Sequence, residues 1–140
     1  MGTIDSALIT RLRAFPGLTA LVGTRIFSHP LPTKSTAYDP YPCVEIVQTH
    51  GRRDYVMGGQ SGLVRAHYDV WSWDDSPAGI RAIAEQVRLA LSHWNGTSDS
   101  VTIDHIELID EDRVDKASEA VGDDMAIVQD YQIWFRETCP

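Results

Sequence analysis

The chain has 140 residues, of which 43% are hydrophobic, and a formal net charge of −8. This length suits one folded unit with its own core, so we expect a single domain over residues 1–140. Its apolar stretches are far shorter than the roughly 20 residues that a membrane span needs, and its first residues are not typical of a signal peptide. Two cysteines, Cys43 and Cys139, are too few for a disulfide framework and indicate free thiols in a reducing compartment.

The negative charge is concentrated in one segment. Residues 99–124 hold ten acidic and two basic side chains, whereas the rest of the chain has ten of each. A surface of this kind repels phosphate, so it does not favour nucleic-acid binding through counterion release. It could instead form a wall past which DNA slides without sticking.

The first part of the chain predicts helices followed by a proline-bounded arm. Thr3 is a candidate N-cap, and apolar residues at helical spacing predict a helix over residues 4–15. After a Pro-Gly pair, residues 18–23 have the pattern of a short helical turn, followed by extended residues 24–27. Prolines on both sides of residues 29–41 exclude regular helix or a central strand, which indicates a surface loop or arm.

The middle of the chain predicts two strands. β-branched residues favour strands at residues 43–49 and 63–73, joined by a glycine-rich connection over residues 50–62. This connection is too long for a tight hairpin turn, so we expect it to be mobile, with strand ends that could extend as a protruding β-ribbon. It contains the adjacent pair Arg52 and Arg53.

The clearest amphipathic element follows Ser76, a candidate N-cap, and Pro77, a typical first helical residue. Apolar residues recur on one face through residues 80–94, which predicts a helix with one buried face. The acidic pair Asp74 and Asp75 is better explained by its favourable position at the start of this helix than by catalysis.

Two more strands are predicted, at about residues 101–109 and 125–137, with an acidic loop between them. The order of elements indicates an α+β fold. We expect a mostly antiparallel four- to five-stranded sheet with two main helices on one face and long protruding loops.

The predicted sheet would leave aromatic side chains on the face that the helices do not cover. Trp71, Trp73 and Trp134 fall on that side of their strands by alternation. Exposed aromatic patches usually mark partner surfaces. The alternative is that the arm of residues 29–41 folds over them.

No motif indicates catalysis or cofactor binding, so we predict no enzyme activity, no cofactor and no metal site. The five histidines lack the spacing of zinc ligands. Residues 110–115 suggest calcium only superficially, because the glycine and glutamate of an EF-hand loop are missing. Neither a phosphate-binding glycine loop nor a serine-hydrolase elbow is present.

Several short motifs in a fixed order resemble a known family. They are Phe15-Pro16-Gly17-Leu18 with Arg25-Ile26-Phe27, then Tyr41-Pro42 before a strand, then Tyr68-Asp69-Val70-Trp71-Ser72 before the amphipathic helix. Together, over roughly residues 4–137, they resemble the tail terminator or tail-completion (head-to-tail joining) proteins of siphophages, the long-tailed bacteriophages.

The resemblance implies a structural virion protein that forms a ring, apparently six-fold, on the end of the tail tube. Such a ring stops tube polymerisation and docks to the neck of the filled head. The implied partners are other copies of the chain, the tail tube protein and a neck or head-completion protein, with transient passage of double-stranded DNA and no membrane. The implied location is the head-tail interface of the virion tail, and the host cytoplasm during assembly.

Three sets of residues receive roles from this resemblance. Ring closure needs two different patches on each copy, for which the candidate interface residues are Trp71, Trp73 and Trp134. The candidates for an acidic lumen that repels DNA are Asp110, Glu111, Asp112, Asp115 and Glu119. The candidates for contact with the tail tube or neck are Arg52, Arg53 and Tyr55, although a solvated loop is an equally good interpretation of the arginines.

Two other interpretations stay open at this point. One is another ring component of the neck, such as a head-completion or adaptor protein. The other is a small α+β enzyme or ligand-binding domain that uses the acidic loop to hold a metal. The mass of the protein in solution and metal-dependent thermal stabilisation separate these classes.

Overall fold

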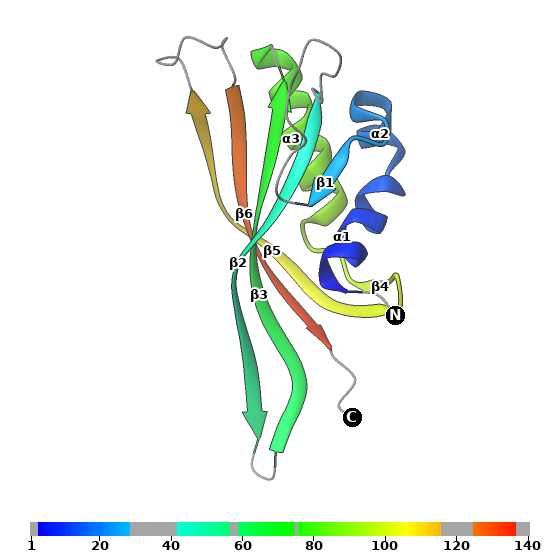
Figure 1. Ribbon diagram of the computed structural model, residues 1–140, viewed down its shortest axis with the longest axis vertical. Helices are drawn as coiled ribbons and strands as arrows, with labels where there is room; N and C mark the ends of the chain where they lie inside the picture. Colours follow the sequence, from blue (N-terminus) through cyan, green and yellow to red (C-terminus); the bar gives the residue numbers. More distant parts are fainter. Residues whose placement is uncertain (1–2, 29–41, 57–58, 75, 116–124, 137–140) are drawn as a thin grey trace.

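Figure 1 shows a computed structural model of the chain, which describes residues 3–28, 42–56, 59–74, 76–115 and 125–136. Within these ranges, three helices and six strands form one unit. In chain order the elements are α1 (Ile4–Arg13), α2 (Pro16–Val22), β1 (Ile26–Ser28), β2 (Cys43–Val56), β3 (Gly59–Asp74), α3 (Pro77–Leu91), β4 (Gly96–Ser98), β5 (Val101–Asp115) and β6 (Met125–Arg136).

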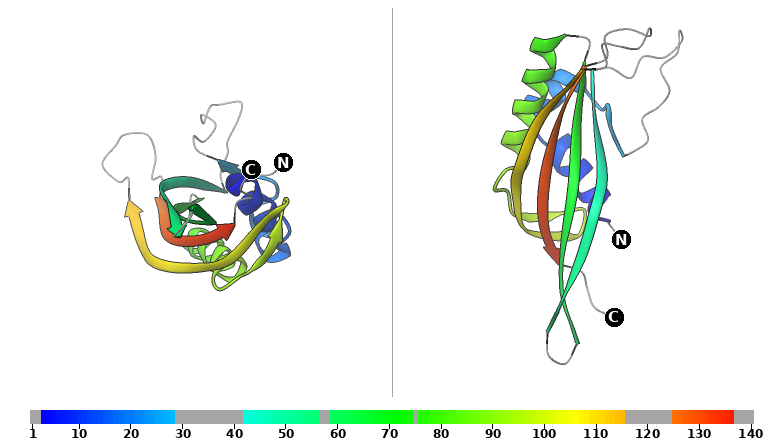
Figure 2. Two further views of the ribbon diagram at one scale, coloured as in Figure 1. Left: turned by 90° about the horizontal axis from the view of Figure 1, so that it is seen from below. Right: turned by 90° about the vertical axis from the view of Figure 1, so that its left-hand side faces the viewer.

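All six strands belong to one sheet in the order β1-β2-β3-β6-β5-β4. β1 and β2 are parallel, whereas the other neighbouring pairs are antiparallel. The sheet curls strongly, and the view from below in Figure 2 shows β5 bending around its neighbours. The prediction of a mostly antiparallel four- to five-stranded sheet with two main helices was therefore wrong. The sheet is mixed and six-stranded, it has the shape of a half-barrel, and three helices accompany it.

The sequence did not predict β4, which has three residues, too few for alternation to show as a pattern. β1 is equally short and overlaps the extended residues that were predicted at 24–27. Next to the parallel pairing of β1 with β2, the N–H of Val44 donates to the carbonyl of Arg25 at 3.0 Å. Helix α2 has seven residues and begins at Pro16, whereas the sequence predicted only a short helical turn over residues 18–23.

The connection predicted at residues 50–62 lies largely within strands. β2 continues to Val56 and β3 already begins at Gly59, so the two form a ribbon that projects past the end of β6 (Figure 1). The expectation that the strand ends extend as a protruding ribbon is confirmed. Register shifts between Gln48 and His50 and between Arg53 and Tyr55 interrupt the alternation, which is why the sequence pattern breaks there.

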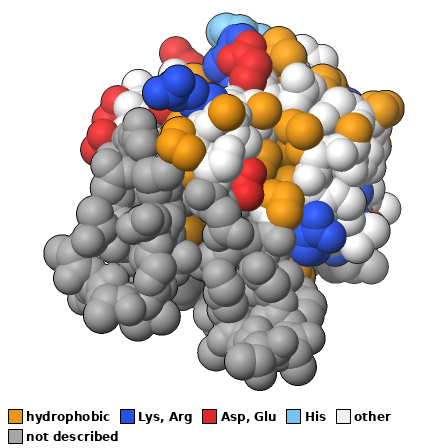
Figure 3. Space-filling model, turned by 90° about the horizontal axis from the view of Figure 1, so that it is seen from above, with side chains coloured by type: hydrophobic (Ala, Val, Ile, Leu, Met, Phe, Trp, Pro, Cys, Tyr) orange, Lys and Arg blue, Asp and Glu red, His pale blue; other side chains and the backbone are white. Residues whose placement is uncertain are grey.

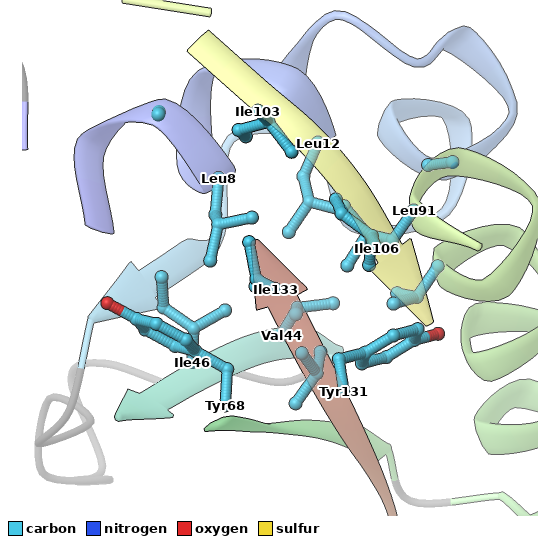
Figure 4. Packing of buried hydrophobic residues seen from close by; sticks show 14 of the residues in the cluster. Leu8, Leu12, Val44, Ile46, Tyr68, Leu91, Ile103, Ile106, Tyr131 and Ile133 are labelled. Atoms are coloured by element: carbon cyan, nitrogen blue, oxygen red, sulfur yellow. The ribbon is translucent and has the colours of Figure 1, made fainter. Parts of the chain in front are cut away.

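The core lies between the three helices and one face of the sheet (Figure 4). Both predicted N-caps are confirmed, since the Thr3 side chain accepts from the Ser6 N–H at 3.2 Å and the Ser76 side chain from the Gly79 N–H at 3.0 Å. The buried side chains that meet in the core include Leu8, Leu12, Val44, Ile46, Tyr68, Leu91, Ile103, Ile106, Tyr131 and Ile133.

A polar contact fixes α1 against the sheet near the base of the ribbon. The hydroxyl of Tyr68 donates to the carboxylate of Asp5, which also accepts from Ser28 Oγ at 3.1 Å. The Tyr68 hydroxyl lies 3.3 Å from Gln48 Oε1. Burial, and then the hydrogen bond to Asp5, raises the pKa of Tyr68, so the hydroxyl stays protonated and can donate. This contact joins α1, β1, β2 and β3.

Candidate assembly surface

The second face of the sheet, called the open face below, has no helix over it in the described part of the chain (Figure 2). Its side chains are those of opposite phase to the core residues. The pairing register places them in rows that run across β2, β3, β6 and β5. Along the strands these rows form an aromatic zone around Trp71 and Trp73, an acidic zone around Asp69 and Asp130, and a mixed zone around Arg65 and Trp134.

The aromatic zone is a compact second cluster, called the aromatic patch, that consists of Phe27, Cys43, Trp71, Trp73 and Ala126. The rings of Trp71 and Trp73 stack, with centroids 5.6 Å apart and planes inclined by 13°. Cys43 is fully buried and Trp73 is only 9% exposed. Trp71 is half-buried, so it provides part of the accessible apolar surface of the patch.

The acidic zone contains three aspartates in one row, called the acidic row. Asp130 on β6 lies opposite Asp69 on β3 and opposite Asp110 on β5. Burial, and then the charge of Asp130, raises the pKa of Asp69, while nearby His67 acts in the other direction. His67 Nδ1 lies 3.9 Å from Asp130 Oδ1. The row therefore gathers negative charge on the open face, with only partial compensation from a histidine.

The acidic row and the aromatic patch are neighbours. In the row next to the aspartates, Asp112 on β5 lies opposite Val128 on β6, and Val128 lies opposite Trp71 on β3. Two sets of residues that the sequence assigned to different roles, the lumen acids Asp110 and Asp112 and the interface residues Trp71 and Trp73, thus share one face.

Trp134 lies apart from the other two predicted interface residues. It is opposite Arg65 on β3, six residues along the strand from Trp71, a separation of about 20 Å in a regular strand. Its ring lies near that of His105, with centroids 5.5 Å apart. The structure therefore brings Trp71 and Trp73 together but places Trp134 in the mixed zone.

Glu111 faces away from Asp110 and Asp112. The side-chain amide of Gln129, which is fully buried, donates to Glu111 Oε1 at 2.9 Å and to the carbonyl of Ala84 at 3.1 Å. The Tyr131 hydroxyl donates to Gln129 Oε1 at 3.2 Å. Burial, and then the charge of Glu111, raises the pKa of Tyr131, which keeps this hydroxyl protonated. Glu111 is thus part of a contact between α3, β5 and β6.

A hollow of about 430 Å³ lies beside this contact. Arg81 and Glu85 of α3 line it together with Glu111 and Asp112 of β5 and Ile127 of β6. Seen from the end of the molecule where α3 begins, the described surface mixes hydrophobic, acidic and basic side chains (Figure 3). Around the hollow, Glu111 and Asp112 therefore lie beside a basic and an apolar side chain.

The remaining predicted site residues are placed by their backbone alone or lie outside the described ranges. Arg52 and Arg53 are opposite Arg65 and Val64 in the ribbon, and Tyr55 is opposite Gln60 near its tip. Asp115 is the last residue of β5, whereas Glu119 lies outside the described residues.

Sequence reasoning missed the acidic row and the buried amide. Asp69, Asp130 and Gln129 stand on predicted strands, but their meeting depends on the register between β3, β6 and β5, which alternation does not give. Gln129 carries one usable signal, since it is a polar residue in the inward phase of β6.

Two further searches concern only the ranges that the structure describes. No group of three or more His, Cys, Asp and Glu side chains there is arranged to hold a metal ion. None of the described helices combines the length and apolar character needed to cross a membrane.

Comparison with solved structures shows that the fold is shared. A chain from the solved virion of a native gene transfer agent (GTA) particle superposes with a TM-score of 0.71 and 16% sequence identity, covering 97% of this chain and 96% of that chain. At this identity the likeness shows a shared fold. A comparison with curated proteins gives no match.

The sequence itself carries the family assignment. Residues 6–136 match the family described as "Tail completion protein gp17". The chain belongs to this family, which confirms the resemblance to tail-completion proteins. It is a structural protein of tail assembly, and its family is one of structural virion proteins.

Proposed function

We propose that this chain forms a ring of six copies that caps the tail tube, stops its polymerisation and joins the tail to the neck of the head. The observation that carries the ring is the open face, where a sheet face without a helix over it holds the stacked pair Trp71 and Trp73. Large aromatic side chains are enriched where protein partners meet. Head-to-tail closure needs two different patches on each copy, and the aromatic patch can supply one of them, with Trp134 in a second zone.

The projecting ribbon is the proposed contact with the tail tube or the neck. Its projection past β6 lets it reach a protein outside its own ring (Figure 1). The ribbon contains Arg52, Arg53 and Tyr55. Two adjacent arginines favour an acidic partner surface.

The lumen for double-stranded DNA is proposed to be lined by acidic side chains of the open face. Asp110 and Asp112 belong to this face together with Asp69 and Asp130, and they repel phosphate, so DNA would pass without sequence-specific binding. Asp115 and Glu119 follow them along the chain and are proposed to continue the acidic lining. Glu111 contributes charge near the rim while its carboxylate holds Gln129. A ring with these carboxylates on its outer wall would contradict this arrangement.

The proposed partners are other copies of the chain, the tail tube protein and a neck or head-completion protein. The proposed place of action is the head-tail interface, after assembly in the host cytoplasm. Family membership and the virion fold support a position in the tail.

The test is electron microscopy of the purified full-length protein mixed with its tail tubes at near-physiological salt. We expect a ring on one end of each tube and tubes of uniform length. Uncapped tubes of variable length, with the protein left free, would contradict the proposal. Binding to isolated heads instead of tubes would favour a neck component.

A further inference from the structure

Two long stretches of strand edge have no partner strand among the described residues. β4 pairs with β5 only through Val101, Thr102 and Ile103, and the carbonyl of Ile106 accepts from the His93 N–H at 2.8 Å. Beyond this point the outer edge of β5 borders no described strand. On the other side of the sheet, β1 pairs with β2 only at residues 44–46, so the edge of β2 over residues 47–56 also borders no described strand.

The two edges carry opposite charge. Residues 107–115 of β5, called the acidic edge, contain five acidic side chains and one arginine. Residues 47–56 of β2, called the basic edge, contain two arginines and one aspartate. An open edge presents unpaired backbone donors and acceptors that favour pairing with another chain, and charge on the edge opposes indiscriminate pairing. Opposite charges on two such edges therefore select these edges for each other.

The acidic edge also contains an exposed apolar residue. Ile109 is 49% exposed and stands at a register shift, where Leu108 pairs with Tyr131 and Asp110 with Asp130. On a strand edge otherwise rich in charge, such a side chain gains burial only from a partner beside β5.

We propose that the acidic edge of one copy pairs with the basic edge of the next copy, so that the sheets of neighbouring copies join edge to edge. This inference rests on the proposed ring and names its contact. Because two different edges meet, the contact is head-to-tail and can propagate until a ring closes. In this arrangement the acidic partner surface of Arg52 and Arg53 is the next copy in the ring instead of the tube or neck, and the tip of the ribbon at Tyr55 remains for the tube or neck.

The position of the edges sets the geometry of the ring. The acidic edge lies toward the end of the sheet that contains the aromatic patch, and the basic edge lies in the ribbon at the opposite end (Figure 1). Joining them shifts each copy along the strand direction relative to its neighbour. A staggered sheet closes only when its strands are inclined to the ring axis, so we expect inclined strands in the ring.

Charge reversal of full-length protein on tail tubes tests the pairing. One variant carries Glu107→Lys with Asp110→Lys, two exposed residues of the acidic edge, and the other carries Arg52→Glu with Arg53→Glu. In each variant alone, the substituted side chains face side chains of their own sign across the junction and the attraction between the edges is lost, so we expect capped tubes to fall by about tenfold or more. Both reversals in one chain restore opposite charges and should restore capping.

A sharper test is an equal mixture of the two variants. If copies alternate around the ring, lysines of one variant meet glutamates of the other at one junction, and native acids meet native arginines at the next. We therefore expect the mixture to cap tubes when neither variant does so alone. Thermal unfolding of each variant checks that it is folded. Ile109→Glu tests the acidic edge without charge reversal, and Leu21→Glu on α2 is its matched control.

The outcomes separate this inference from the proposed function. If the wild type and each of the two charge-reversal variants alone cap tubes, the edge pairing is overturned and the proposed capping function stands. Loss of capping without rescue by either the combined chain or the mixture would also overturn it, because the arginines would then act on another protein. Failure of the wild type itself to cap tubes would instead reject the proposed function.

Discussion

Asp69 stands on the open face in surroundings that disfavour its charge. Burial and the charge of Asp130 raise its pKa above the unfolded value, and His67 offsets this only in part. The ionised carboxylate therefore destabilises the fold at pH values above both its folded and unfolded pKa. This penalty declines as the pH falls through the folded pKa and is absent below the unfolded pKa.

Asp69→Asn should raise the thermal stability of the isolated chain near pH 7, by about 2 °C on the usual scale of such changes. The reason is that the neutral amide carries no ionisation penalty. Melting curves from pH 7 down to pH 3 should show the gain shrinking as the wild-type carboxyl becomes protonated. Asp99→Asn is the matched control, since Asp99 is exposed with φ 46° and asparagine tolerates this conformation. A gain that is equal at both ends of the pH range would contradict the electrostatic cause.

Among the elements, α3 contacts the sheet through its apolar face and through a buried amide, that of Gln129. Gln129→Leu keeps the approximate volume but leaves the carbonyl of Ala84 and the carboxylate of Glu111 without their donor. We expect the free energy of unfolding to fall by about 2–3 kcal/mol. Urea unfolding measures it, with Gln132→Leu on the open face of the same strand as the control. Equal effects of the two substitutions would show that Gln129 does not hold α3.

How much the sequence predicts depends on the range of the interaction that defines each element. The starts of α1 and α3 follow from N-caps directly before them, at Thr3 and Ser76, which bond to a backbone N–H three residues further on, and were predicted correctly. β1 and β4 exist because a distant strand offers an edge, which leaves no local periodicity. The ribbon was placed within a connection because its bulges and glycines disrupt alternation.

The candidate surface was predictable only as separate residues. Alternation alone placed Trp71 and Trp73 on the face opposite the helices, as the structure has them. It could not separate Trp134 from them along the strands. Nor could it place Asp110 on the open face and Glu111 on the helix face, because alternation continued from Leu108 gives the reverse and a register shift between Leu108 and Asp110 changes the phase of β5. The acidic row required three strands to be aligned.

For the whole molecule, the open face joins an apolar and an acidic surface on one sheet. Trp71, the accessible part of the aromatic patch, gains most from being covered, whereas the carboxylates of the acidic row lose least if they stay in water. A ring that covers the patch with a neighbouring copy and leaves the acidic row toward the lumen satisfies both. The aromatic patch and the edges of the sheet would then act together at each junction.

Trp71→Gln should therefore weaken ring formation much more than it weakens the fold. Trp71 is half-buried and stacks on Trp73, so a modest loss of stability is expected, but truncation of a central aromatic contact typically costs an interface about 2 kcal/mol or more. That cost corresponds to roughly a thirtyfold loss in affinity at each junction. Electron microscopy of tail tubes titrated with each protein measures it, and Leu21→Gln, an exposed apolar residue on α2, is the control. Capping by the Trp71 variant at wild-type concentrations would mean that the patch is covered within its own chain, and the junctions would then depend on the strand edges alone.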